Sequence, residues 1–394
     1  MSIIKFLDLG SQPIANGFLT QEEFADEFFF NLSVGLDEET RLVTQMEYVS
    51  PDKMFNDSYA YRGSLSQTMR SHFSEATESL APHLPKSPKV LEIGSNDGVF
   101  IKNWETKTTF AVEPCSNFAD ETNNLGYTTY ASFWDTKLSE QIMSEQGCMD
   151  LIYAANCMCH IPDLDETFKA VSNLLAPEGL FVFEDPSLVE MLSRNSYDQI
   201  YDEHAHIFSV TALNNLLNRN GLKIINVEAL SVHGGSNRIW AARSDSPKTF
   251  SFDLELYLVQ EGMSGVDNLG VLDNFATKVL LSKENLIELL HTFNMEDKKV
   301  ISYGATSKST TIFNYCNIDS SLIDCITDTT PEKQGKYSPG THIRIVAAPL
   351  QIDDAVDVAF LGAWNFEKEI KKKEHKFVER GGQFITHVPH VRLV

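Results

Sequence analysis

Acid–base side chains are concentrated in one short segment, Tyr201-Asp202-Glu203-His204-Ala205-His206. Buried charges must be paired, so such a cluster is costly inside a core. A solvated surface has little use for two histidines and a tyrosine. Histidine has the side-chain pKa nearest neutrality, which suits it to proton transfer. The segment therefore indicates a site where a proton is moved, although a hydrogen-bonded loop network that orders a cleft would use the same residue types.

A glycine-rich turn, Gly94-Ser95-Asn96-Asp97-Gly98, follows an apolar run that ends in Glu92 and Ile93. Glycines let backbone amides approach a ligand at a strand-to-helix turn. Glu113 ends the next apolar run, where it is placed to accept hydrogen bonds from ribose hydroxyls. The glycine spacing differs from the dinucleotide pattern, and the Asp97 carboxylate would repel a pyrophosphate. The turn therefore favours S-adenosylmethionine over a dinucleotide, with a tight packing turn as the structural alternative.

A third polar segment, Asn156-Cys157-Met158-Cys159-His160-Ile161-Pro162, follows the apolar run at 150–154. Ligands of open parallel sheets bind at the carboxyl ends of the strands. His160 is therefore expected near the cleft, where it either contacts substrate or serves as a structural histidine.

These segments need a sheet to bring them together. Short apolar runs at 89–93, 109–112, 150–154 and 179–184 predict strands with helices between them, which is typical of a mostly parallel α/β sheet. Ser209 is expected to cap a helix that ends at Gly221, and 222–230 and 237–242 to form two more strands. Residues 250–295 predict a helical connector, and strands at 299–303, 322–326 and 356–360 a second α/β region. The first 70 or so residues look irregular, with a turn-rich stretch at 7–13 and short strands expected at 28–34 and 42–48, and a helix is expected at 64–80.

Composition narrows the function classes. The chain has 394 residues and a formal charge of −23, which argues against nucleic acid and anionic membranes as partners. No secretory signal or bilayer-spanning run is visible. The six cysteines form no Cys-x-x-Cys pair, which is typical of reduced thiols in a cytoplasmic protein.

Together, these motifs resemble one family, the S-adenosylmethionine-dependent C-methyltransferases that act on nucleotide-linked keto-deoxysugars (sugar 3-C-methyltransferases). Beyond the segments above, the resemblance rests on motifs in the C-terminal half of the chain, which are His233-Gly234-Gly235-Ser236, Tyr303-Gly304-Ala305, residues 328–335, 337–341, and Trp364-Asn365-Phe366. It implies an α/β fold with a central Rossmann-like class I methyltransferase sheet. The expected parts are a small N-terminal lobe (1–75), the S-adenosylmethionine-binding domain (76–245), the helical connector (246–296) and a C-terminal α/β nucleotide-sugar-binding domain (297–394).

The resemblance also assigns roles. Methylating a sugar carbon requires an enolate, hence one base and donors for the enolate oxygen. His204 is the implied base, supported by Glu203 and Tyr201, while His160 is a polar contact near the methyl donor and His206 has no assigned role. A tyrosine of the segment with Tyr59 and Tyr61 reaches toward the sugar, and we favour Tyr61. Cofactor contacts are expected from Glu92, Gly94, Asn96, Gly98, Glu113 and Asn156, and substrate contacts from His233, Asn237, Tyr303, Lys308, Lys333 and Tyr337.

One departure concerns metal. Family members carry two cysteine pairs in an N-terminal zinc-binding domain, one before Leu7-Asp8-Leu9-Gly10 and one further on. Here neither is found, and residues 34–42 hold no cysteine. A closed structural zinc site needs four ligands. We therefore expect no zinc, a lobe held by packing, and a monomer or weak homodimer.

Three alternatives stay open. An NAD-dependent sugar-nucleotide oxidoreductase is disfavoured by the glycine spacing. An O- or N-methyltransferase would need no carbon acid, and a non-catalytic nucleotide-sugar binder would not need the acid–base segment. The sequence does not specify the nucleotide or the sugar.

Overall fold

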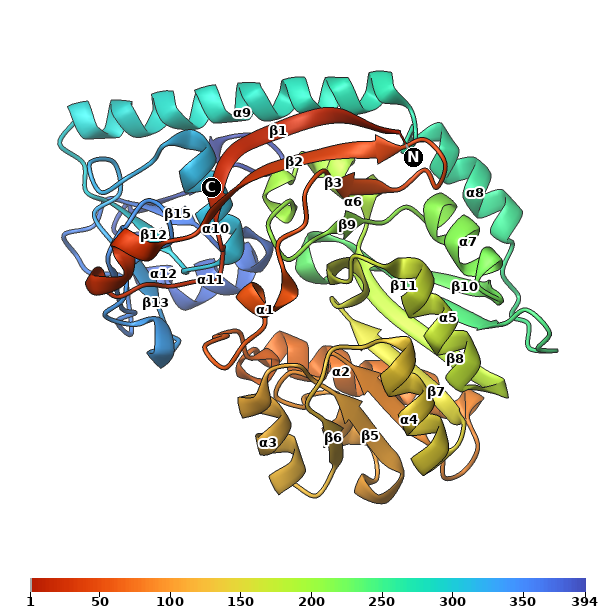
Figure 1. Cartoon of the computed structure of the whole chain (residues 1–394). Coiled ribbons are helices and arrows are strands. Elements are labelled where there is room, and N and C mark those ends of the chain that lie inside the picture. Colours follow the sequence, from red (N-terminus) through yellow and green to blue (C-terminus); the bar gives the residue numbers. More distant parts are fainter. Residues whose placement is uncertain (1) are drawn as a thin grey trace.

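The computed structural model describes residues 2–394 and contains three β-sheets. In Figure 1 the long helix α9 runs across the top of the molecule, above the ribbon of β1 and β2. The central domain lies below on one side and the C-terminal domain on the other. Within the described residues, no helix combines the length and the apolar character needed to cross a bilayer.

The N-terminal lobe is a four-stranded antiparallel sheet in the order β1-β2-β3-β9. The short strands expected at 28–34 and 42–48 are confirmed, whereas the turn-rich interpretation of 7–13 was wrong, because those residues belong to an eleven-residue strand. That strand has register shifts between Lys5 and Leu7 and between Asp8 and Ser11. Such bulges break the period-two alternation that identifies a strand in sequence. The elements of the sheet and its linker are β1 (Ile3–Pro13), β2 (Phe29–Asp37), β3 (Val43–Gln45), β9 (His206–Ile207) and α1 (Pro51–Met54).

The central sheet has seven strands in the order β10-β11-β8-β7-β4-β5-β6. It is parallel except for β11, which pairs antiparallel with both β8 and β10, and the two strands predicted at 222–230 and 237–242 are confirmed. The strand at 109–112 and the Ser209 cap were also predicted correctly, whereas the three-residue β6 was missed. The strands are β4 (Val90–Ile93), β5 (Thr109–Val112), β6 (Thr128–Tyr130), β7 (Met149–Ala155), β8 (Leu175–Pro186), β10 (Leu222–Leu230) and β11 (Ser236–Arg243). The helices are α2 (Gln67–Leu80), α3 (Ser116–Asn124), α4 (Thr136–Gln146), α5 (Leu164–Leu174), α6 (Leu188–Arg194) and α7 (Val210–Arg219).

The C-terminal domain is a six-stranded sheet in the order β14-β13-β12-β15-β16-β17, parallel except for β17. The predicted strand at 322–326 is largely a turn: β13 begins at Ile326, and Leu322 and Ile323 are apolar because they enter the core. The elements are β12 (Val300–Tyr303), β13 (Ile326–Asp328), β14 (Ile345–Ala347), β15 (Val358–Leu361), β16 (Gln383–Thr386), β17 (Arg392–Leu393), α10 (Ser307–Cys316), α11 (Glu367–Lys373) and α12 (His375–Glu379).

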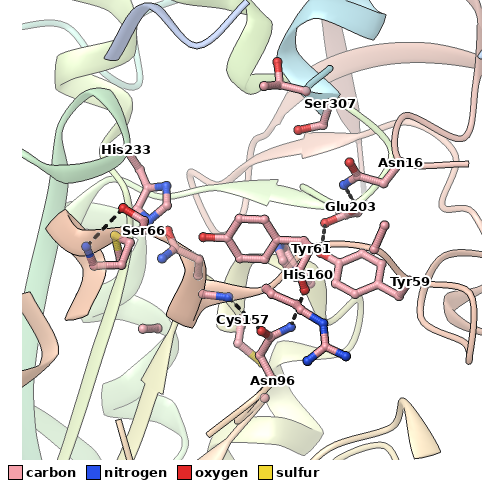
Figure 2. A pocket seen from close by; sticks show the side chains of 18 of the residues that line it. Asn16, Tyr59, Tyr61, Ser66, Asn96, Cys157, His160, Glu203, His233 and Ser307 are labelled. Atoms are coloured by element: carbon pink, nitrogen blue, oxygen red, sulfur yellow. Dashed lines mark hydrogen bonds between the residues drawn. The ribbon is translucent and has the colours of Figure 1, made fainter. Parts of the chain in front are cut away.

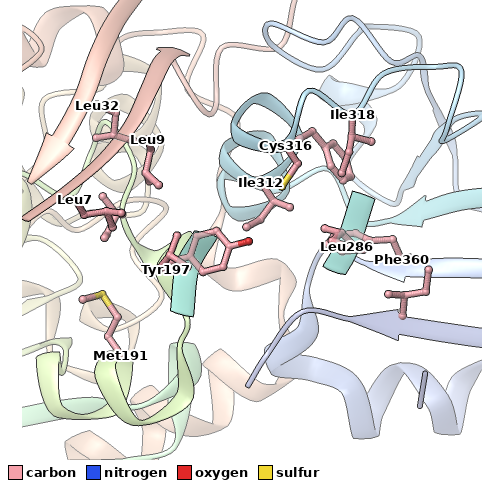
Figure 3. Close-up of a cluster of buried hydrophobic side chains, with 14 of the residues drawn as sticks. Leu7, Leu9, Leu32, Met191, Tyr197, Leu286, Ile312, Cys316, Ile318 and Phe360 are labelled. Carbon is pink, nitrogen blue, oxygen red and sulfur yellow. The ribbon is translucent and has the colours of Figure 1, made fainter. Parts of the chain in front are cut away.

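The predicted helical connector is confirmed as α8 (Leu254–Met263) and α9 (Leu269–Met295). Apolar residues at helical spacing bury one face of α9. They join a core that also contains Leu7 and Leu9 of β1 and Ile312 and Cys316 of α10 (Figure 3). One hydrophobic core therefore holds the N-terminal lobe and the C-terminal domain together.

We predict that Leu286→Ala in α9 lowers the free energy of unfolding by about 2–5 kcal/mol, because a fully buried leucine leaves a cavity. The matched control is Leu281→Ala on the same helix, where the side chain is 51% exposed. The control should change stability by less than about 0.5 kcal/mol. The free energy of unfolding is measured by chemical denaturation. If it fell equally in the two variants, the buried face of α9 would not be what stabilises this core.

Candidate active site

One pocket, with a volume of about 740 Å³, is lined by all three parts of the chain (Figure 2). The volume lies in the range usual for small-molecule sites. The lining includes most of the residues proposed from the sequence, namely Tyr61, Glu92, Gly94, Asn96, Glu113, Asn156, His160, Tyr201, Glu203, His204, His233, Tyr303, Lys308 and Lys333. The structure thus brings together side chains that are far apart in the sequence, from Tyr61 to Lys333.

Gly98, Asn237 and Tyr337 are not among the lining residues. A Cβ at Gly98 would lie 2.8 Å from Thr122, so this glycine serves packing against α3. Asn237 donates to the Ser187 hydroxyl at 3.4 Å, and Tyr337 pairs with Leu19 through the backbone. The structure gives these three a structural position instead of the expected ligand contact.

His204 has the geometry of a base. Its Nδ1 lies 2.6 Å from the carbonyl oxygen of Gln199. A carbonyl only accepts hydrogen bonds, so Nδ1 carries the hydrogen and Nε2 keeps a free lone pair. Burial, with His160 and Lys308 adding to it, holds the pKa of His204 well below its usual value. The ring is therefore neutral near pH 7 and able to take a proton.

His160 lies beside this base. The His160 and His204 rings stack with their centroids 5.3 Å apart. The Phe55 ring also stacks on His160, with a centroid separation of 5.4 Å. Burial lowers the pKa of His160 to about 3, so it too is neutral.

Five lining side chains hold a buried polar atom without a partner in the described part of the chain. The atoms are Glu92 Oε2, Ser95 Oγ, His160 Nε2, Gln199 Oε1 and His233 Nε2. Buried polar atoms are normally hydrogen-bonded, so such groups at the wall of a pocket are the ones a ligand would satisfy.

Glu203 is held from the N-terminal lobe. Its Oε1 accepts from Asn16 at 2.6 Å and its Oε2 from the Tyr59 hydroxyl at 3.0 Å (Figure 2). Burial raises the pKa of Glu203 against the effect of these two hydrogen bonds. The tyrosine that contacts the acid–base segment is therefore Tyr59, whereas the favoured Tyr61 lines the pocket. Asn16 was missed, because nothing in its sequence neighbourhood marks it as functional.

The glycine turn, Glu113 and Asn156 converge at the carboxyl ends of β4, β5 and β7, the position expected for a ligand site in a parallel sheet. Gly94 has a φ of 74°, and a Cβ there would lie 2.7 Å from the Cys157 sulfur, so no other residue fits. The Glu113 carboxylate accepts from the backbone of Asn96 at 2.7 Å, which fixes the turn.

The Asp97 side chain does not lie where the sequence analysis expected it. Its carboxylate accepts from the Ser64 hydroxyl at 2.5 Å and from the Ser64 backbone at 3.2 Å. It is fully buried and does not line the pocket. The expectation that its charge faces the ligand was wrong, and its function is to tie the linker from the lobe to the glycine turn.

Lysines gather at the C-terminal side of the pocket. The Lys308 ammonium lies 5.8 Å from the centre of the Tyr201 ring, and Lys333 donates to the Ala305 carbonyl at 2.8 Å. Lys308 stands in the first turn of α10, whose Thr306 cap accepts from the Ser309 amide. The lysines and the helix amino terminus make this side suited to phosphate oxygens.

Three family models match successive parts of the chain. Residues 1–55 match a zinc binding domain, 65–227 a methyltransferase domain, and 231–389 a C-methyltransferase C-terminal domain. The lobe therefore matches the family's own N-terminal domain, and the expectation that the chain departs from the family in this region was wrong. The same match conflicts with the expected absence of zinc. The residues present do not fit the metal, however, because 1–55 contain neither cysteine nor histidine.

The described residues hold one group of three possible metal ligands, Cys159, His160 and His204, with donor atoms within 4.8 Å of one another. This group lies at the pocket and not in the lobe. A closed structural zinc site takes four ligands, one more than this group offers.

Over 395 aligned residues, the chain is 32% identical to the C-methyltransferase NovU of Streptomyces niveus, covering 98% of this chain and 93% of NovU. Solved structures with similarity include an S-adenosylmethionine-dependent methyltransferase from Clostridium acetobutylicum (17% identity, 44% of this chain, 92% of that chain, TM-score 0.35). Another is an S-adenosylmethionine-dependent methyltransferase from Mesorhizobium loti (16% identity, 42% of this chain, 96% of that chain, TM-score 0.33). The match to NovU over nearly the whole length, together with the family models, shows that this chain belongs to the S-adenosylmethionine-dependent C-methyltransferases.

Proposed function

We propose that the protein transfers the methyl group of S-adenosylmethionine to a carbon of a nucleotide-linked deoxysugar, at C3 next to a 4-keto group, through an enolate. The observation that carries the proposal is the state of His204. This neutral histidine has Nδ1 committed to a carbonyl and Nε2 unprotonated, in a pocket shared with the glycine turn. C-methylation at a carbon acid requires such a base.

In this proposal His204 Nε2 removes the proton from C3, and the electron pair of that bond becomes the enolate of the 4-ketone. Tyr201, buried and with its ring centre 4.1 Å from that of His204, donates to the enolate oxygen. C3 of the enolate is then the nucleophile for the methyl group that bound S-adenosylmethionine would supply, with the sulfur leaving as a neutral thioether. His204 later releases its proton to solvent.

S-adenosylmethionine supplies the electrophilic methyl when bound. Glu92, Gly94, Asn96, Glu113 and Asn156 are the residues that would hold it, since they surround the carboxyl ends of β4, β5 and β7. His160 would bind at the boundary between donor and sugar through its unpartnered Nε2. On the other side, Lys308 and Lys333 would bind the phosphates of the nucleotide, with Tyr303 and His233 as further sugar or nucleotide contacts.

The alternatives are less well supported. An O- or N-methyltransferase would be unusual in a family named for C-methylation. A non-catalytic binder would not need a histidine held in the basic tautomer. The cytoplasmic location and the monomeric or weakly dimeric state remain predictions.

We predict that His204→Asn lowers the methyl-transfer rate by about 10²–10⁴-fold, because a general base is lost. Binding of S-adenosylmethionine, followed by calorimetry, should persist. His206→Asn is the matched control, since His206 is equally buried but does not line the pocket, and its ring contacts the Pro162 carbonyl. A His204 variant that keeps nearly the full rate would remove this residue from the base role.

The pH dependence follows from the same pocket. Burial lowers the pKa of His204 well below 6.5 and that of His160 to about 3, so both stay neutral as the pH falls. We expect kcat to stay level from about pH 8 to about pH 6, whereas a histidine with an ordinary pKa of about 6.5 would lose about three quarters of its basic form in that interval. A half-loss of kcat near pH 6.5 would contradict this electrostatic description.

The substrate is tested by incubating the protein and S-adenosylmethionine with dTDP-, GDP- and CDP-linked keto-deoxysugars. We expect one of them to gain the mass of one CH₂ group, with the new methyl bonded to carbon by NMR. A methyl on oxygen or nitrogen would support the second alternative. Binding without transfer across the whole panel would support the third.

A further inference from the structure

Trp364 belongs to a motif that the proposed mechanism does not use. It follows β15 in the C-terminal domain, and its indole N–H donates to the Asp198 carboxylate at 2.5 Å. Asp198 lies in the central domain, on the short 3-10 helix Tyr197–Gln199, and is fully buried. The hydrogen bond therefore crosses from the C-terminal domain to the segment that precedes the acid–base cluster.

The next residue after Asp198 holds the base. The Gln199 carbonyl accepts the hydrogen of His204 Nδ1 at 2.6 Å, and the Gln199 side chain donates to the His233 carbonyl. Trp364 also packs on this second segment, because a Cβ at Gly234 would lie 2.5 Å from its ring. One indole thus contacts both the segment that contains Gln199 and the segment that the Gln199 side chain binds.

Asp198 is a strong acceptor for this contact. Asp198 is buried, yet two groups hold its pKa below the usual value. They are His387, whose Nε2 lies 3.4 Å from the Asp198 carboxylate, and Lys308. An ionised acceptor makes a shorter and stronger hydrogen bond than a neutral one. On the other side of Trp364, its chain neighbours Ala363 and Asn365 line the pocket.

We propose that Trp364 and Asp198 are positioning residues, which fix the Gln199 carbonyl and thereby keep His204 in the tautomer with a free Nε2. The inference rests on the proposed role of His204 as the base. Besides binding the nucleotide, the C-terminal domain would then also fix the position of His204 in the central domain. Small displacements of a reacting group cost large factors in rate, since a shift of about 1 Å can lower it by about 10²-fold.

The test is Trp364→Phe, which keeps an aromatic ring against Gly234 and removes only the N–H. We expect kcat to fall by about 10–100-fold with the KM for S-adenosylmethionine unchanged. In the absence of substrates, the ¹⁵N shifts of His204 should change from the pure Nδ1–H form to a mixture of tautomers. Trp240→Phe is the matched control, because its buried Nε1 has no partner among the described residues.

A second pair of variants separates positioning from mere packing. Asp198→Asn retains an oxygen that accepts the indole N–H and should keep much of kcat and the Nδ1–H tautomer. Asp198→Ala should lose both. If Trp364→Phe and Asp198→Ala remain folded by circular dichroism and leave the His204 tautomer unchanged, the inference is overturned. If no sugar is methylated by the wild type while the tautomer still shifts in the variants, the proposed function fails and the positioning role stands.

Discussion

A single amide side chain stabilises the segment on which the site depends. Gln45 of β3 donates to the carbonyls of Tyr201, His204 and Asp202 at 2.7, 2.9 and 3.3 Å. Its backbone N–H donates to Ala205 at 2.9 Å. Residues 201–205 are buried and lie in no helix or strand, so their carbonyls have no regular partners. Leaving buried carbonyls unpaired costs free energy, and the N-terminal lobe removes that cost by donating from β3.

Burial then sets the charge state of the site. It lowers the pKa of His204 and raises that of Glu203, so each is shifted toward its neutral form. Asp198 is the contrasting case, since its partners keep it ionised where it serves as an acceptor. Besides Arg62, which pairs with Glu121, the positive charges in the pocket come from lysines of the C-terminal domain. A strongly acidic chain, with a net charge of −23, thus carries a locally cationic wall where an anionic substrate would bind.

The sequence allowed the central sheet to be predicted because its strands are short, apolar and separated by helices. The same logic failed for β1, where bulges break the alternation, and at Leu322 and Ile323, where apolar residues in a turn resemble a strand. Most chemical groups were predicted because their types are distinctive. Gln45, Asn16 and Asp198 were missed, because common polar residues gain their roles only through contacts with partners more than 150 positions away. Local pattern does not encode such contacts.

The pairing of β3 with β9 makes the lobe and the central domain one folding unit. Residues 206 and 207 supply the last strand of a sheet whose other strands end before residue 46. A chain cut between residues 55 and 65, where the family models separate, would leave β3 as an open edge and residues 201–205 without their donor. An exposed edge strand invites pairing with another chain. The lobe and the central domain therefore cannot be separated without consequence. A deletion that parts β3 from β9 would expose strand edges that can pair with another copy of the chain.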